Sequence, residues 1–261
     1  MRRLGAADAA RNPRGIGHLV LLDIGGQGRH GVFLSIVARF VSYRALVRAI
    51  DSYVAGYHSR QRPNAPVTIS LGTNNDLLTS TQAGRLWANR VVDPVQSAAE
   101  HFPDITIAGA NDIEPGFSAG PRATRHWLRG YLQHTKAPFV FNGSADGCSW
   151  TRPFSHCNRG WTARTLARLA GTAAPKRIFV LPQIYNRKMA GQWAQISRTA
   201  VRTRHTRLHI VGPLTEERAC GRKPACPSMP SRAAWQLLHY KLHSVGLLPS
   251  ALPVRVDLDV H

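Results

Sequence analysis

The chain has 261 residues, of which 43% are hydrophobic, and this apolar content excludes a disordered or collagen-like chain. No stretch reaches the roughly 18 unbroken apolar residues that a membrane span needs, so we expect no membrane-spanning segment in this sequence. The 34 Lys and Arg against 14 Asp and Glu give a net charge of +20. This charge favours anionic partners such as nucleic acid, a membrane surface or an acidic cell wall.

Residues 1–17 are predicted to form a basic tail, and residues 18–261 a single domain. The tail lacks the apolar run of a secretory signal. From His18 onward, short β-rich runs alternate with stretches of helical period. The expected strands are His18–Asp23, Val32–Val37, Val67–Leu71, Ile105–Gly109, Pro138–Asn142, Arg177–Pro182, Leu208–Gly212 and Val254–Leu258. The expected helices are Tyr43–His58, Thr81–Glu100, Pro121–Thr135, Thr162–Ala170, Lys188–Arg202 and Ser231–Ser244.

This alternation predicts an α/β fold with a parallel sheet and helical crossovers. Eight strand candidates in one domain predict a (β/α)8 TIM-type barrel. The barrel is expected to be irregular at its second strand, because only a Gly-rich loop separates that strand from the first.

Four cysteines form two close pairs in loops rich in Gly, Pro and Ser, namely Cys148 with Cys157 and Cys220 with Cys226. This pattern predicts two small disulfides and an oxidising compartment. Zinc ligands and reduced thiols are the alternatives, although zinc sites usually have closer spacing. We therefore expect an exported, extracytoplasmic protein whose leader is missing from this sequence.

The densest cluster of positive charge lies around Arg202 and leads into an expected strand. Its members are Arg198, Arg202, Arg204 and Arg207. No aromatic residue close in the sequence offers a platform on which bases would stack. The charge also suits a GC-rich genome, because only five of the 34 cations are Lys. We do not expect nucleic acid to be the main partner.

Acidic residues are rare in this chain, yet six of them follow the ends of expected strands: Asp23, Asp76, Asp112, Glu114, Asp146 and Glu216. The carboxyl ends of parallel strands form the edge where active sites assemble. The alternative is that loops simply favour Asn, Asp and Gly. From this edge we expect the substrate-binding residues Asp23, Gln27, Asn74, Asn75, Asn142, Asp146, Gln183 and Asn186.

The most informative motif is Asp112-Ile113-Glu114, which follows the expected strand Ile105–Gly109. In extended backbone, residues i and i+2 point to the same side, so both carboxylates would face one cleft. Two such carboxyls cannot both ionise freely, so one keeps its proton and serves as a general acid. Glycosidic bond cleavage needs such a pair. A helix-capping role for Asp112 is the structural alternative.

The D-x-E motif, together with Gln183-Ile184-Tyr185-Asn186, resembles the chitinase-type and lysozyme-type (β/α)8 glycoside hydrolases. The wider set LDIGGQ, SLGTNND, GANDIEPGF, FNGSADGC and LPQIYN looks like an uncharacterised bacterial group within that superfamily. The resemblance implies that Glu114 is the acid/base and that Asp112 orients the N-acetyl group of the substrate. It also implies that Tyr185 donates a hydrogen bond to the acetamido oxygen, which is itself the nucleophile.

The chain departs from the chitinase-type pattern in two places. Ala110 stands where that family has a further Asp, and the last expected strand, VRVDLD, lacks the Trp often found there. A barrel that binds a glycan without cutting it is therefore the alternative function. Trp150 and Trp161 flank the first cysteine pair and are candidates for stacking against sugars.

Three other motifs receive less weight. Gly26–Gly31 matches GxGxxG, but the following residues have a strand pattern and not the helix of a dinucleotide fold. His239 and His243 have zinc-binding spacing but lack a third ligand and a catalytic Glu. The acids at the strand ends could together hold Mg²⁺ or Ca²⁺.

The sequence thus predicts a hydrolase of an N-acetylated polysaccharide such as peptidoglycan or chitin. We expect a monomer that uses no cofactor and no metal, and whose positive charge holds it near an anionic wall.

Overall fold

The computed structural model describes residues 1–11, 18–34, 37–77, 79–172, 174, 176–215, 229–247 and 255–257. The α-helices are α1 (Arg2–Arg11), α2 (Tyr43–His58), α3 (Thr81–Trp87), α4 (Asp93–Ala99), α5 (Pro121–His134), α6 (Ala163–Ala167), α7 (Arg187–Arg204) and α8 (Ser231–Ser244). Two π-helical turns, η2 (Ala88–Val92) and η4 (Arg168–Thr172), and one 3₁₀ turn, η3 (Asn158–Gly160), join them.

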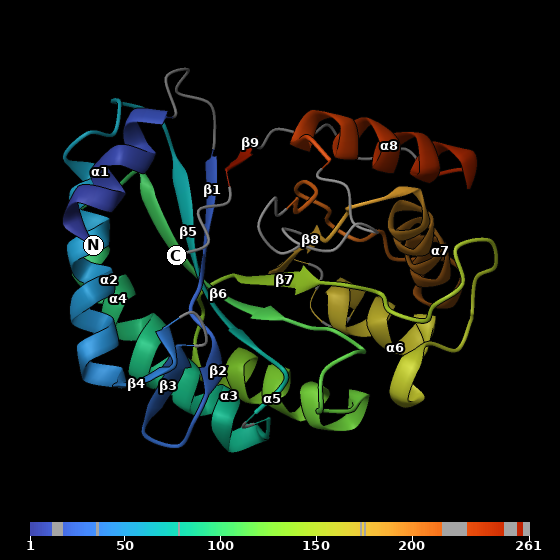
Figure 1. The fold of residues 1–261 in the computed structure, drawn as a ribbon, viewed down its shortest axis with the longest axis horizontal. Coiled ribbons are helices and arrows are strands. Elements are labelled where there is room, and N and C mark those ends of the chain that lie inside the picture. The colour runs from blue at the N-terminus through green and yellow to red at the C-terminus, as the bar shows by residue number, and fades with distance from the viewer. Residues whose placement is uncertain are drawn as a thin grey trace. The chain divides into compact units, whose positions relative to one another are not determined.

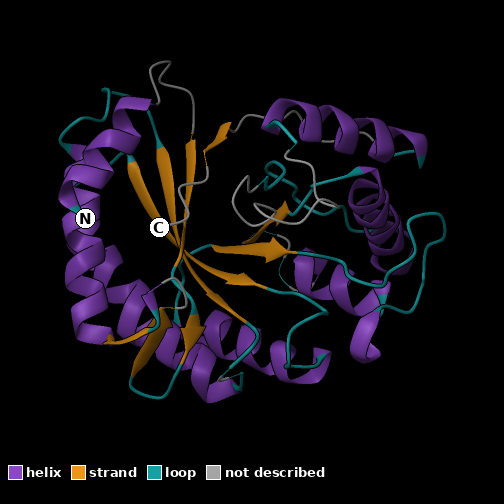
Figure 2. Ribbon diagram, viewed as in Figure 1, coloured by secondary structure: helices purple, strands orange, loops and turns teal. Residues whose placement is uncertain are grey.

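The strands are β1 (His18–Asp23), β2 (Gly26–Gln27), β3 (Gly31–Leu34), β4 (Arg39–Ser42), β5 (Val67–Asn74), β6 (Ile105–Asp112), β7 (Phe139–Gly143), β8 (Ile178–Pro182) and β9 (Arg255–Asp257). Six of them form one sheet in the order β8-β7-β6-β5-β1-β9, and the other three form a separate sheet in the order β2-β3-β4. Strand β1 pairs in parallel with β5, from His18 opposite Val67 to Asp23 opposite Gly72. Figure 2 shows these two strands side by side.

The prediction of a (β/α)8 barrel is wrong. The described strands form an open sheet and a small antiparallel sheet, and they do not close into an eightfold barrel. The expected second strand instead lies in β3, which pairs with β2 and β4. A parallel neighbour needs a crossover of a dozen or more residues, and the short Gly-rich loop after β1 permits only a hairpin. The expected seventh strand makes only an isolated bridge, between Ile210 and Val180.

The chain divides into two compact units. The first contains Met1–Asn111, Ala123–Phe139 and Pro253–His261, and the second contains Asp112–Arg122 and Val140–Leu252. The first unit thus holds β1 to β5, nearly all of β6 and the helices α1 to α4. The second holds β8, most of β7 and the helices α6, α7 and α8.

In the first unit, the segment that we expected to be a basic tail includes the helix α1. Figure 1 shows α1 and α2 side by side, and the two helices are in contact. A Cβ built on Gly56 would lie 2.0 Å from the backbone oxygen of Arg2, so only glycine allows this close approach. The hydroxyl of Tyr53 on α2 donates a 2.6 Å hydrogen bond to Asp8, which is buried and also pairs with Arg11.

The expected helix Thr81–Glu100 exists, but it consists of α3, the π-turn η2 and α4. Pro94 lies just after the π-turn. A proline inside a helix has no N–H to donate and clashes with the carbonyl four residues earlier, so the regular bonding pattern shifts there. The sequence therefore predicts the extent of this helix but not its change of pitch.

Helix α2 matches its predicted bounds, and its N-cap Ser42 accepts a 3.3 Å hydrogen bond from the N–H of Ala45. Asp51 lies within this helix, and its Oδ1 is buried with no hydrogen-bond partner among the described residues. This burial raises the pKa of Asp51 above its ordinary value of 3.8. The charged carboxylate therefore destabilises the folded protein.

We expect Asp51→Asn to raise the melting temperature at pH 7 by roughly 1–3 °C. Because the pKa of Asp51 is raised in the folded state, the free energy of unfolding of the wild type falls as the pH rises above 3.8. The variant has no carboxyl group at this position and does not show this decrease. Thermal unfolding followed by circular dichroism at pH 3.5 and pH 7 measures the effect. A gain of equal size at both pH values would contradict this explanation.

In the second unit, a disulfide joins Cys148 and Cys157, as predicted for this pair. The predicted pair Cys220 and Cys226 lies outside the described residues. The loop is also anchored to α7, because the Nε2 of Gln192 donates a 2.9 Å hydrogen bond to the backbone oxygen of Cys148. The disulfide thus restrains the loop that follows β7.

Replacing both Cys148 and Cys157 by Ala is expected to lower the free energy of unfolding by about 2–3 kcal/mol. The reason is that the crosslink closes a short loop and so restricts the unfolded chain. The melting temperature should fall by about 5–10 °C, measured by calorimetry without reductant. An unchanged melting temperature would show that the disulfide contributes nothing to stability.

Candidate functional site

The candidate site lies where β6, β7 and β8 end, in the second unit. The N–H of Ile113 donates a 2.7 Å hydrogen bond to the backbone oxygen of Asn142, and the N–H of Gln183 donates a 3.0 Å bond to that of Gly143. These bonds align the residues that follow the three strands. The polar residues after each strand are therefore neighbours at one edge of the sheet.

Asp112 and Glu114 flank Ile113 at this edge. Both are partly exposed, whereas Ile113 between them is fully buried. This alternation is the one expected of extended backbone, in which residues i and i+2 point the same way. The Nε2 of Gln183 donates a 3.0 Å hydrogen bond to Oδ1 of Asp112. The Asp112 carboxylate is thus held in a fixed orientation by a residue that follows β8.

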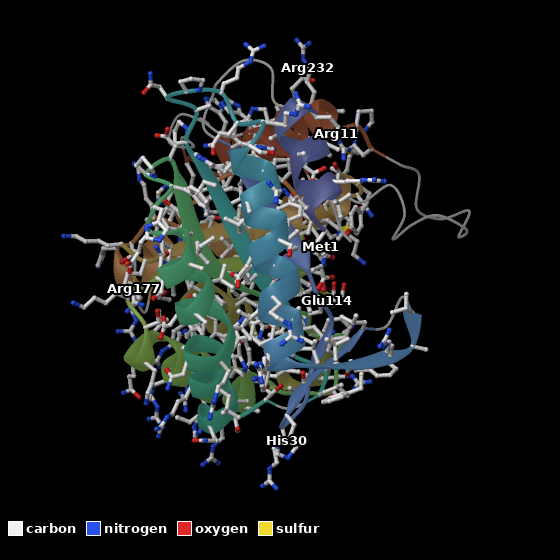
Figure 3. The ribbon with its side chains drawn as sticks, turned by 90° about the vertical axis from the view of Figure 1, so that its left-hand side faces the viewer. Met1, Arg11, His30, Glu114, Arg177 and Arg232 are labelled. Atoms are coloured by element: carbon white, nitrogen blue, oxygen red, sulfur yellow. A yellow bond between two sulfur atoms is a disulfide. The ribbon has the colours of Figure 1, made fainter. Side chains whose placement is uncertain are left out.

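Glu114 begins a tight turn with the sequence Glu114-Pro115-Gly116-Phe117, and it is labelled in Figure 3. The N–H of Phe117 donates a 3.2 Å hydrogen bond to the Glu114 backbone oxygen. Pro and Gly are the favoured residues for the two central positions of such a turn. The turn ends the extended segment directly after Glu114, which is partly exposed.

Asp146 adds a third carboxylate close to this turn. Its Oδ2 lies 3.0 Å from the position of a Cβ built on Gly116, so any larger residue at that position would crowd the carboxylate. The backbone oxygen of Asp146 accepts a 3.0 Å hydrogen bond from the N–H of Asn158. Asp146 therefore lies between the turn after β6 and the disulfide-closed loop.

Two buried polar atoms at the end of β7 have no hydrogen-bond partner among the described residues, namely Oδ1 of Asn142 and Oγ of Ser144. Buried polar groups are nearly always satisfied, so each such atom calls for a water or a ligand. Ser144 was not among the predicted site residues. Its position two residues after Asn142 on the same strand end is the signal that would have suggested it.

Tyr185 follows Gln183 by two residues, with the fully buried Ile184 between them. Tyr185 is partly exposed. Gln183 is itself buried, so the segment after β8 differs from the segment after β6, where the residues on both sides of Ile113 are partly exposed. Asn186 has a structural part in the fold, because its Oδ1 accepts a 3.0 Å hydrogen bond from the N–H of Met189 and caps α7.

The other predicted substrate-binding residues, Asp23, Gln27, Asn74 and Asn75, belong to the first unit. Asn74 follows an ordinary turn pattern, because its Oδ1 accepts a 3.2 Å bond from the N–H of Asp76. Asn75 is fully buried, and its Nδ2 donates a 3.4 Å bond to Oγ1 of Thr124. Asp23 is partly exposed at the end of β1.

Gln27 is fully buried, and its amide links three elements of the first unit. Its Nε2 donates to the hydroxyl of Tyr43 at 3.0 Å and to the backbone oxygen of Ala83 at 2.9 Å. Its Oε1 accepts a 2.8 Å bond from Nε1 of Trp127. Burial raises the pKa of Tyr43 above its usual value, and the bond from Gln27 partly offsets this. These hydrogen bonds indicate that Gln27 stabilises the packing of the first unit.

The candidate motifs that we gave less weight have ordinary structural surroundings. The GxGxxG segment forms the turn between β2 and β3, closed by a 2.8 Å bond from the Gly28 N–H to the Gly31 oxygen. His239 on α8 packs edge-on against Trp235. Trp161 is fully buried, whereas Trp150 is 48% exposed. Within the described part of the chain, no three His, Cys, Asp or Glu side chains gather closely enough to hold a metal ion.

None of the described helices combines the length and the apolar character that crossing a membrane requires. No protein-family model matches this chain, and no curated protein matches it either.

Proposed function

We propose that the protein hydrolyses an N-acetylated polysaccharide, such as peptidoglycan or chitin, at the ends of β6, β7 and β8. The observation that carries the proposal is the pair Asp112 and Glu114, which are both partly exposed on either side of the buried Ile113. Glycosidic bond cleavage requires an acid for the leaving oxygen and an anion for the developing positive charge.

Glu114 is the proton donor in this proposal, because it is a partly exposed carboxyl at the end of the extended segment. It protonates the glycosidic oxygen while the acetamido oxygen of the substrate attacks the anomeric carbon and the glycosidic bond breaks. A water molecule then opens the resulting cyclic intermediate. Glu114, now ionised, accepts the proton of that water, so its protonation state is restored at the end of the cycle.

Asp112 orients the acetamido N–H and balances the positive charge that develops next to it. The Nε2 of Gln183 supports this role, because its 3.0 Å hydrogen bond to Oδ1 holds the Asp112 carboxylate in a fixed orientation. Tyr185 supplies the hydroxyl that steadies the acetamido oxygen. The buried Oδ1 of Asn142 and Oγ of Ser144, which have no hydrogen-bond partner in the described part of the chain, suit the hydroxyl groups of a sugar.

The Cys148–Cys157 disulfide supports an extracytoplasmic site of action, because such bonds persist in oxidising compartments. The net charge of +20 suits an anionic wall polymer as the surrounding material.

Mass spectrometry of the products tests the proposal. Purified peptidoglycan and chitin oligosaccharides are incubated with the wild-type protein, and new reducing ends identify the bond that is cut. Saturable glycan binding without any product would reject hydrolysis and favour a binding protein that uses the same residues. Neither binding nor product would reject the proposal altogether.

A further inference from the structure

The second unit contains a pocket of about 390 Å³ that we call the arginine pocket. Its charged lining consists of Arg164, Arg168, Arg202 and Arg204. Thr165, Thr203 and Phe154 complete it. None of these residues has a part in the proposed hydrolysis.

The arginines come from two helical segments that pack on each other. Arg164 and Arg168 are four residues apart on α6 and the π-turn that continues it, so they lie on one face. Arg202 and Arg204 lie in the last turn of α7. Helices α6 and α7 are in contact, and Figure 1 shows them as neighbours.

The positive charge of this pocket is uncompensated among the described residues. None of its four arginines pairs with a carboxylate of the described chain, and no acidic residue lines the pocket. Cations at a helix C-terminus complement its dipole, which accounts for Arg202 and Arg204 but not for the pair on α6. Four guanidinium groups around one hollow repel each other, and a bound anion relieves that repulsion. Their planar forks match the oxygens of a phosphate.

Phe154 is held at the pocket by a strained backbone. Its φ of 59° lies in the left-handed region, which is unfavourable for a bulky residue, and its side chain is 43% exposed. The N–H of Phe154 donates a 3.2 Å hydrogen bond to Oγ1 of Thr199 on α7. The Cys148–Cys157 disulfide closes the loop that carries Phe154. Such outliers point to function when the surroundings enforce them.

The Phe154 ring already contacts the positive charge of the pocket. The Cζ of Arg164 lies 6.0 Å from the centre of the ring, a cation–π arrangement. From the sequence alone, the arginines around Arg202 had no aromatic neighbour. The disulfide-closed loop brings one to them, and the pocket thus combines anion-binding groups with an exposed aromatic face.

We propose that the arginine pocket binds an organic phosphate, with the phosphate between the arginines and its attached ring on the face of Phe154. The ring is either a sugar or a nucleobase, since both pack on aromatic faces. The pocket has the size of a small-molecule site, and this favours a small phosphate over a polymer. This proposal does not depend on the hydrolytic activity.

Isothermal titration calorimetry at low salt tests the proposal. The probes are N-acetylglucosamine 1-phosphate and AMP, with N-acetylglucosamine and adenosine as the matched compounds that lack phosphate. We expect one of the two phosphates to bind and its partner without phosphate not to bind. The preferred phosphate identifies the ring as sugar or base. Equal binding of the phosphorylated and unphosphorylated compounds, or no binding of either phosphate, would overturn the proposal.

Variants separate the two parts of the site. Arg168→Gln combined with Arg202→Gln is expected to weaken binding of the phosphate by about ten- to a hundredfold, because charge-assisted hydrogen bonds are lost. Arg125→Gln combined with Arg232→Gln is the matched control, because both arginines are exposed and outside the pocket, and this variant should bind like the wild type. Unchanged affinity in the double variant would reject the pocket as the site.

Phe154→Ala is expected to weaken binding of the ring-bearing phosphate while leaving that of inorganic phosphate unchanged. Equal affinity of this variant and the wild type for the ring-bearing compound would overturn the role of Phe154. Binding only to a single-stranded oligonucleotide, with affinity that rises with its length, would overturn the small-molecule proposal in favour of a nucleic-acid surface.

Discussion

Replacing Glu114 by Gln is expected to lower the rate of polysaccharide hydrolysis by about 10²–10⁴-fold, because the amide cannot donate a proton to the leaving oxygen. The shape of the side chain is nearly unchanged, so the fold and glycan binding should be retained. Release of reducing ends from peptidoglycan or chitin oligosaccharides measures the rate, and circular dichroism checks the fold.

Glu100→Gln is the matched control, because Glu100 is exposed at the end of α4 in the first unit. This substitution removes one carboxylate as Glu114→Gln does, and it should leave the rate at the wild-type value. If Glu114→Gln retained full activity, Glu114 would not be the acid. If both variants lost activity equally, the removal of one negative charge from the protein would be the cause.

Replacing Trp127 by Ala is expected to lower the free energy of unfolding by about 3–5 kcal/mol. Trp127 is buried, stacks on Tyr131 with 5.8 Å between ring centres and packs against Phe139 at 5.9 Å. Its removal leaves a large cavity and takes the hydrogen-bond donor away from the buried Oε1 of Gln27. Chemical denaturation followed by fluorescence or circular dichroism measures the loss.

Trp127→Phe separates the two contributions. This variant keeps most of the apolar volume but removes the indole N–H. The free energy of unfolding should therefore fall by less than it does for Trp127→Ala, but it should still fall measurably below the wild-type value. A loss below about 1 kcal/mol for Trp127→Ala would show that the first unit repacks around the missing ring. Such a result would also contradict the structural part that the Gln27 contacts indicate.

The helices were predictable where local signals agree with the tertiary environment. Helix α2 and helix α8 have the bounds expected from their apolar period, and the proline at the start of α5 lies where a helix N-terminus favours it. Helix α1 was not predicted because it has no strong apolar face. Its buried Asp8 and its close glycine contacts depend on α2, far along the chain.

The barrel prediction failed at a specific place. The alternation of residues after Gly31 is that of a strand, and β3 is indeed a strand, but alternation does not tell which sheet a strand joins. The loop before it was the decisive signal, because it is too short for a helical crossover. The prediction counted strands but did not consider whether each connection was long enough for a parallel neighbour. It therefore gave eight parallel strands, whereas the described residues form a six-stranded sheet and a separate three-stranded sheet.

The candidate site was partly predictable. The alternation around Ile113 predicted that the two acids would be more accessible than the residue between them, and Asp112 and Glu114 are partly exposed around the buried Ile113. The contact between Gln183 and Asp112 was beyond reach, since it depends on the order of the strands in the sheet.

The arginine pocket could not be predicted from the sequence for a related reason. Phe154 and Arg202 are distant in the sequence. The left-handed backbone of Phe154 could not be predicted either, because a phenylalanine does not signal such a conformation. Gln27 shows the opposite case. Its place in a Gly-rich loop suggested a cleft residue, whereas its partner Trp127 is 100 residues away.

A crystal structure of the Glu114→Gln variant, soaked in turn with tetrasaccharides from chitin and from peptidoglycan, tests the central claim most directly. We predict that one of them binds at the ends of β6, β7 and β8, with an acetamido group within hydrogen-bond distance of Asp112 and Tyr185 and a glycosidic oxygen next to residue 114. A sugar bound elsewhere on the protein, or no sugar in either soak, would contradict the assignment of this edge as a glycan-cleaving site.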